Sequence, residues 1–142
     1  MDLTWYGHST VGVRLGDTEL LIDPFFDNPH TATDPETLDP DHVLITHGHA
    51  DHIGDVSAVA DTHVVGTPEV VGYLAAEHGV EETTGMNLGG TVELGDAYVT
   101  MHRADHTNGL ETGYEFSGGL PAGYVISDTK PTQVSDAEST TF

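Results

Sequence analysis

A short apolar run that leads directly into a cluster of histidine and aspartate most constrains how this chain can fold. Residues 43–46 read Val-Leu-Ile-Thr, and residues 47–52 read His-Gly-His-Ala-Asp-His. Consecutive apolar residues over this length are typical of a buried strand. The pattern therefore predicts a central strand that feeds a loop with several side chains able to bind metal.

The spacing of these side chains suits metal binding. Imidazole nitrogens and carboxylate oxygens are ligands for zinc and for other borderline divalent metals. His47 and His49 are two residues apart, so in an extended segment both rings point to the same side. Asp51 and His52 are adjacent, so a turn or helix start there can direct both at a second point. The segment therefore predicts a site for two metal ions that lie close together.

The absence of cysteine narrows the chemistry that the chain can use. None of the 142 residues is Cys, which excludes disulfides, thiolate nucleophiles and Cys-type zinc sites. The chain also contains no Gly-x-Ser-x-Gly elbow, no phosphate-binding Gly-Lys loop and no dinucleotide fingerprint. His, Asp and Glu remain as the strong metal ligands.

The acidic composition limits the expected partners. Asp and Glu number 24 against 3 Lys and Arg, and the formal net charge is −21. Nucleic acid and anionic membranes both require a basic patch, so neither is an expected partner, and no apolar run is long enough to span a membrane. The acidic residues are spread along the chain, which favours adaptation to high salt, where counterions screen the repulsion. Residues 1–10 carry no basic stretch or apolar signal core, so we expect a cytoplasmic protein.

The remaining pattern predicts one α/β domain over residues 1–142, with strands in the middle and helices outside. A loop rich in Pro and Asp is expected over 23–41. Helices are expected over 53–60 and 68–78, the second with Thr67 as its N-cap and Pro68 in its first turn. Strands are expected over 3–6, 11–15, 19–22, 43–46, 62–65, 91–94, 98–102 and 123–127.

Further candidate residues lie outside the main cluster. His106 follows an expected strand end, where active-site loops tend to lie, and is the best further ligand, with His102 as the alternative. His8 lies in a turn between the first two strands and either reaches the site or is a plain turn residue. Asp23 orients the metal-binding loop, forms an Asx-turn before Pro24, or does both, since bound imidazoles usually donate their other N–H to a carboxylate.

Several stretches together resemble the metallo-β-lactamase superfamily, and most closely its branch of metal-dependent hydrolases related to the ascorbate-phosphate lactonases. They extend along the whole chain, and His-x-His-x-Asp-His is the strongest marker among them. The matching stretches are Gly7-His8-Ser9, residues 21–25, residues 46–54, residues 85–91 and residues 121–124.

The resemblance implies an αββα sandwich with a two-metal site at one edge of the sheets. The implied ligands are His47, His49 and His106 for the first ion, and Asp51 and His52 for the second. Zinc is the expected divalent metal, with manganese, iron and nickel as alternatives. A water activated by the ions would attack an ester, lactone or phosphoester bond of a small-molecule substrate, with Asp51 and His8 as catalytic residues.

The chain departs from the superfamily pattern toward its end. A bridging Asp in a Gly-Asp-Thr segment and a last His are both absent, and Asp128-Thr129 falls in an expected hairpin turn one strand too early. Residues 139–142 are β-prone, so we expect the chain to be the N-terminal portion of a longer hydrolase domain. The alternative is a metal-binding fragment or module without catalytic activity. Association into a homo-oligomer is left open.

Overall fold

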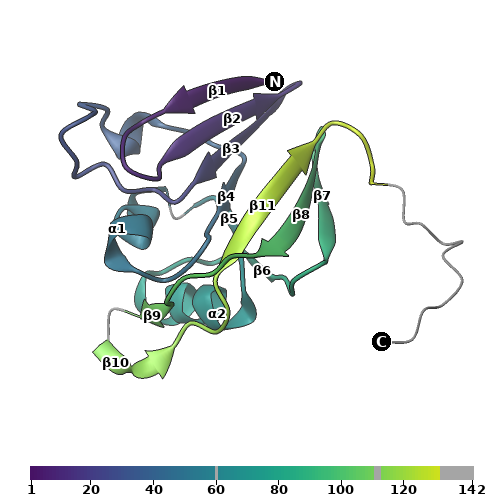
Figure 1. Cartoon of the computed structure of the whole chain (residues 1–142). Helices are drawn as coiled ribbons and strands as arrows, with labels where there is room; N and C mark the ends of the chain where they lie inside the picture. The colour runs from purple at the N-terminus through teal and green to yellow at the C-terminus, as the bar shows by residue number, and fades with distance from the viewer. Residues whose placement is uncertain (60, 111–112, 132–142) are drawn as a thin grey trace, which may run out of the picture.

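Helices, a six-stranded sheet and a three-stranded sheet form three layers in the computed structural model, which describes residues 1–59, 61–110 and 113–131 (Figure 1). The α/β class predicted from the sequence is confirmed, and these layers are three of the four in an αββα sandwich. Among the described residues no helix covers the outer face of the smaller sheet, where Val125 is 54% exposed. Residues 139–142, expected to be β-prone, lie outside the described part.

The larger sheet begins as an antiparallel meander and continues with parallel strands. Short turns connect the first three strands, whereas longer crossovers that include the helices connect the next three. The sequence predicted no strand at 83–85, because its three residues, Thr-Thr-Gly, show no alternation of apolar and polar side chains. In sheet order the strands are β1 (Asp2–Trp5), β2 (Val11–Leu15), β3 (Thr18–Ile22), β4 (His42–Leu44), β5 (His63–Gly66) and β6 (Thr83–Gly85).

The smaller sheet is antiparallel and lies beside a two-stranded hairpin. The hairpin was not expected from the sequence, since one of its strands has only two residues. The sheet strands are β7 (Thr91–Leu94), β8 (Ala97–Arg103) and β11 (Ala122–Ser127), with β8 in the middle. The hairpin strands are β9 (Gly109–Leu110) and β10 (Gly113–Ser117).

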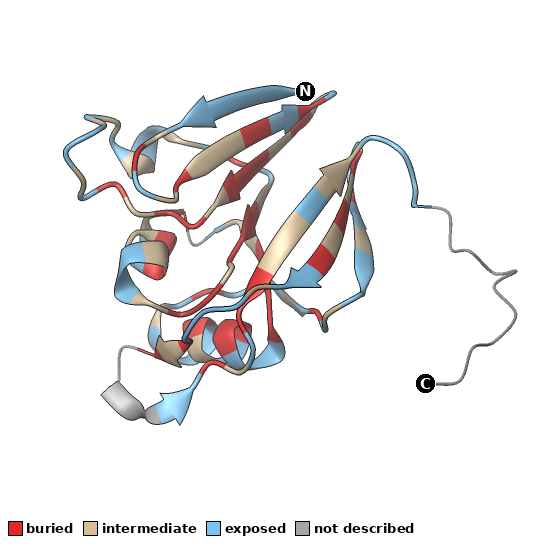
Figure 2. Ribbon diagram, in the orientation of Figure 1, coloured by how far each residue is buried: buried red, intermediate tan, exposed pale blue. Residues whose placement is uncertain are grey.

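Two apolar cores lie on opposite faces of the larger sheet. Val43 and Ile45 pack in the core between this sheet and the helices, whereas Leu44 packs in the core between the two sheets. All three are fully buried, and Figure 2 shows the buried positions concentrated along the central strands. The consecutive apolar residues of β4 are thus explained by burial on both faces, as in parallel sheets generally.

The second expected helix is confirmed with a change at its start. Helix α2 covers Pro68–Glu77, with Thr67 at the N-cap position in an extended conformation. The Thr67 hydroxyl does not cap the helix but donates to Gly118 O at 3.1 Å. The described helices are all too short or too polar to cross a lipid bilayer.

The first expected helix, over 53–60, is wrong. Helix α1 covers Ala50–Ile53, and a separate 3-10 helix, η2, covers Val56–Val59. Asp55 explains the break, because its N–H donates to Pro24 O at 3.0 Å and its carboxylate accepts from Phe26 N at 2.6 Å. These bonds to the loop at 24–26 replace the helical hydrogen bond that Asp55 would otherwise make. Within the expected loop, one turn of 3-10 helix, η1, covers Pro35–Thr37.

Candidate metal centre

The histidine-rich segment lies where β4 passes into α1. Residues 46–49 form the connection, and His49 occupies the N-cap position of α1 in an extended conformation. Asp51 therefore lies in the first turn of α1, with His52 next to it, and Ile53 anchors the helix in the core. This is the helix start that the adjacent Asp51 and His52 led us to expect.

The structure brings together the three histidines expected around a first ion. His47 Nε2 lies 3.0 Å from His49 Nδ1, and the His106 ring centre lies 4.7 Å from that of His47. One ring nitrogen from each of the three lies within 4.8 Å of the others. His102 belongs to no such group among the described residues and is exposed on β8. The geometry favours His106 over His102, while the role of the three as ligands stays a prediction.

A second group of donors lies beside the first. His8 Nε2 is 3.1 Å from Asp51 Oδ2, and one donor atom from each of His8, Asp51 and His52 lies within 4.8 Å of the others. The turn that carries His8 closes through Thr10 N, which donates to Gly7 O at 2.9 Å. His8 itself has a φ of 48°, which is uncommon for a residue other than glycine. The N-terminal turn thus delivers a strained histidine to the cluster, as strained residues often occur at functional sites.

Asp23 orients the site from beneath. Its carboxylate is buried and accepts from Thr46 N at 2.8 Å, from Thr46 Oγ at 2.6 Å and from His52 Nδ1 at 2.7 Å. Phe25 N, which an Asx-turn would engage, donates instead to Thr10 Oγ at 3.0 Å. Of the two roles left open for Asp23, orientation of the loop therefore holds.

Burial and mutual repulsion shape the ionisation of the cluster. Burial, followed by the charges of His52, His49 and His106, lowers the pKa of His47 to about 3. For Asp51, burial opposes the shift, but its own backbone N–H and the neighbouring His52 and His8 outweigh it and lower its pKa. At neutral pH His47 is therefore neutral and Asp51 ionised, which are the forms in which these groups bind metal.

The metal-free chain is expected to lose stability as the pH falls below the ordinary histidine pKa. His47 has a pKa of about 3 when folded against 6.5 ordinarily, so between these values the unfolded chain binds a proton that the folded chain does not. Stability therefore decreases with falling pH in this window, by up to about 1.4 kcal/mol per pH unit. Melting temperatures measured with a chelator between about pH 7 and about pH 5 check this dependence of stability on pH. Most carboxylates titrate below this pH range and do not contribute to it. His47→Asn should flatten it, and an unchanged stability of the parent would contradict the prediction.

Removal of the Asp23 carboxylate is expected to destabilise the metal-free chain strongly. Asp23→Ala leaves the buried Thr46 N–H and the His52 ring without their acceptor, at a cost of about 3–5 kcal/mol. Asp23→Asn is the matched control, because it keeps one acceptor oxygen and Asn tolerates the φ of 47° at this position. Urea unfolding at neutral pH measures the difference. An Asp23→Ala variant as stable as the parent would show that the carboxylate does not hold the loop.

An open cavity of about 570 Å³ exposes both donor groups to solvent. Its walls include His8, Asp51 and His106 together with the apolar side chains of Ile22 and Pro121. A volume of this order suits a small-molecule ligand. The donors and a ligand-sized space therefore coincide.

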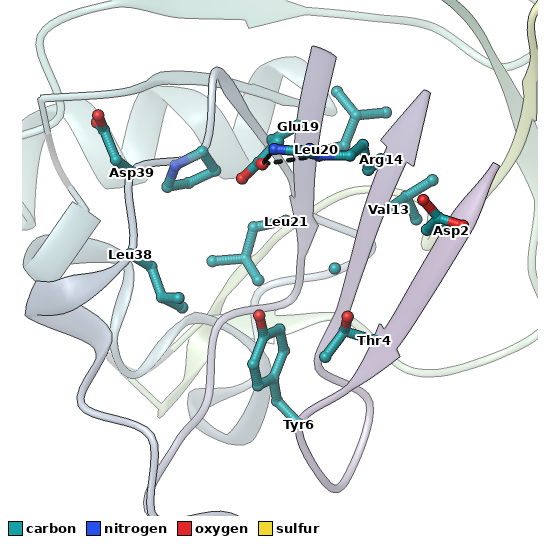
Figure 3. A pocket seen from close by; sticks show the side chains of 12 residues that line it. Asp2, Thr4, Tyr6, Val13, Arg14, Glu19, Leu20, Leu21, Leu38 and Asp39 are labelled. Atoms are coloured by element: carbon teal, nitrogen blue, oxygen red, sulfur yellow. Dashed lines mark hydrogen bonds and ion pairs between the residues drawn. The ribbon is translucent and has the colours of Figure 1, made fainter. Parts of the chain in front are cut away.

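A second hollow, of about 200 Å³, lies on the outer face of β1–β3. Figure 3 shows Tyr6 and Leu38 on its walls, with the Arg14–Glu19 ion pair at its rim. It contains no histidine, and its one cation is already paired, so it offers no comparable chemistry.

Comparison with known proteins identifies the family. The family model described as a beta-lactamase superfamily domain matches residues 18–135. The chain belongs to this superfamily. The resemblance found in the sequence is therefore confirmed.

Close relatives of the chain are longer proteins from haloarchaea. A protein of Halobacterium salinarum named as a metal-dependent hydrolase is 72% identical over 142 residues, which make up all of this chain and 59% of the relative. A protein of Haloarcula marismortui with the same description is 70% identical over 145 residues, covering all of this chain and 61% of that protein. Their source supports the expected adaptation to high salt.

Solved structures support the superfamily fold. A metallo hydrolase from the hyperthermophilic archaeon Ignicoccus hospitalis superposes with a TM-score of 0.72 at 28% identity, over 88% of this chain and 55% of that chain. The described layers are therefore those of a metallo-hydrolase fold.

Two features of the structure had no signal in the sequence. Asn108 is buried beside the cluster and accepts from Gly48 N at 2.7 Å. At the other end of the larger sheet, His42 Nδ1 lies 3.0 Å from His63 Nδ1, where the sequence offered no partner for either residue. Burial and then His63 lower the pKa of His42. Register between neighbouring strands creates this pair, and a single sequence does not show register.

Proposed function

We propose that the chain is the metal-binding part of a metal-dependent hydrolase that acts on an ester, lactone or phosphoester bond of a small molecule. The observation that carries the proposal is the convergence of two donor groups on one cavity. These are the imidazoles of His47, His49 and His106, and the group of His8, Asp51 and His52.

The donor set fits divalent metal ions of the zinc type. His47 and His52 each hold one ring nitrogen against a protein oxygen, with His47 Nδ1 2.9 Å from Thr46 Oγ and His52 Nδ1 2.7 Å from Asp23 Oδ2. This arrangement makes Nε2 the nitrogen of each ring that could bind an ion, with His47 Nε2 3.0 Å from His49 Nδ1, and it is how metal-binding imidazoles are usually oriented. Nitrogen and carboxylate donors suit zinc, manganese, iron or nickel. Bound ions supply Lewis-acid activation of a water and of the bond to be cleaved.

The remaining polar groups of the chain hold protons and charge around the cavity. The lowered pKa of Asp51 keeps its carboxylate ionised at neutral pH, so it accepts a hydrogen bond from water or from His8. His8 Nε2 lies 3.1 Å from Asp51 at the wall of the cavity, a position from which a proton held between the two side chains could pass to a leaving group. We therefore assign the catalytic roles to Asp51 and His8.

A metal-binding module without catalytic activity is the second candidate, because the bridging Asp of the superfamily pattern does not occur in the sequence. The two candidates are separated by assaying this chain and the Halobacterium salinarum relative side by side. Both are loaded with zinc or manganese and tested on a nitrophenyl ester, a lactone and a nitrophenyl phosphodiester, with chelated samples as controls.

The hydrolase is supported if the relative turns over a substrate only with metal bound. A variant of the relative without the histidine equivalent to His47 should lose this turnover. Metal binding by both proteins without turnover of any substrate class favours the module. Absence of metal binding by this chain would refute the proposed centre altogether.

A further inference from the structure

Asn108 joins the two loops that carry the clustered histidines. Its side chain is 8% exposed. Gly48 N donates to Asn108 Oδ1 at 2.7 Å, and Asn108 Nδ2 donates to Gly118 O at 2.8 Å. A backbone N–H must face the amide oxygen and a carbonyl must face the NH2 group, so these partners fix the orientation of the side chain.

The surroundings leave this amide little room to move. Gly118 N donates to Asn108 O at 2.7 Å, so Asn108 and Gly118 are tied by both backbone and side chain. A Cβ atom on Gly118 would lie 2.3 Å from Asn108 Oδ1, and one on Gly48 would lie 2.5 Å from a methyl carbon of Leu110. A side chain at position 118 would therefore displace the amide, and one at position 48 would push Leu110 aside, so the junction is tightly packed.

The junction links the histidines of the first donor group. Gly48 stands between His47 and His49, while His106 precedes Asn108 by two residues. The Gly48–Asn108 bond thus connects the two loops directly behind the imidazoles. In the same place Thr107 Oγ lies 3.5 Å from His49 Nε2, a longer and weaker contact.

We propose that Asn108 is a positioning residue that sets the separation of His106 from His47 and His49. Its functional meaning rests on the proposed metal centre, but the positioning itself is a property of the metal-free chain. Loss of the amide frees the His106 loop from the His47–His49 loop. The expected consequence is a first donor group that no longer converges.

Proton NMR of the metal-free chain tests the positioning without any ion. The ring centres of His47 and His106 are 4.7 Å apart, so a ring-to-ring NOE is expected in the parent chain. Asn108→Ala should lose this NOE. Asn108→Asp should weaken it, because the carboxylate keeps the acceptor for Gly48 N but places a second acceptor against Gly118 O.

Thr18→Ala is the matched control. It removes a buried hydroxyl that accepts from Asp96 N at 2.8 Å, at the far end of the larger sheet, and should retain the NOE. If Asn108→Ala does not fold, Asn108→Asp carries the test. An unchanged NOE in a folded Asn108 variant overturns the proposal.

Cobalt(II) titration supplies a second readout. Asn108→Ala should bind the ion about 10–100-fold more weakly, as expected when a residue that orients ligands is lost, and should change its visible absorption. Thr18→Ala should do neither. Equal affinity and an identical spectrum for Asn108→Ala would overturn the role of Asn108 at the metal. A parent chain that binds no cobalt would refute the proposed centre, while the NOE still decides whether Asn108 positions His106.

Discussion

Replacing His106 with alanine is expected to lower the affinity of the chain for its first divalent ion by about 100-fold or more, whereas replacing His102 should leave it unchanged. Loss of a residue that only orients a ligand costs about 10–100-fold in affinity, so loss of a ligand should cost at least the upper value. His106 contributes one of three ring nitrogens that lie within 4.8 Å of one another. Two imidazoles alone cannot hold an ion as firmly as three.

His102→Ala is a closely matched control. The two residues lie four positions apart in sequence, both side chains are exposed, and each variant removes one imidazole from an acidic protein. Only their positions differ, because His102 stands on β8 opposite Gly123 and His106 lies on the loop beyond the strand. Competition with a coloured chelator measures the affinity for zinc. A large loss in His102→Ala with none in His106→Ala would transfer the assignment to His102.

The stability of the chain is expected to depend steeply on salt. Its net charge of −21 is carried with only 3 basic residues, so repulsion opposes the compact state at low ionic strength. The Debye length falls from about 10 Å at 0.1 M to about 3 Å at 1 M, which screens this repulsion. We expect the melting temperature to rise by about 10 °C or more over this range, the shift that about 3 kcal/mol produces in a domain of this size.

A charge variant separates screening from other effects of salt. Exposed acidic residues that lie away from the cluster are suitable for it, and we choose Glu77, Glu81 and Glu93, each replaced by Gln. The triple variant should melt higher than the parent at low salt and gain less from added salt. A parent melting temperature that does not change with salt would contradict adaptation to high ionic strength.

The sequence alone was enough to place the main elements of the candidate site. The run at 43–52 combines a doubly buried strand with ligand residues at close spacing, so both the strand and the first four candidate ligands could be predicted locally. His106 could also be predicted as a candidate ligand from the sequence, because it follows the end of an expected strand. Pro68 and the apolar face behind it marked the start of α2.

Tertiary structure decided what depends on contacts between distant residues. His8 meets Asp51, and Asn108 meets Gly48, through pairings that no local pattern encodes. The helix expected over 53–60 fails for the same reason, since bonds from Asp55 to the loop at 24–26 outweigh its local helical preference. Sequence periodicity reports which face of an element is buried, whereas strand register and loop packing determine which side chains meet.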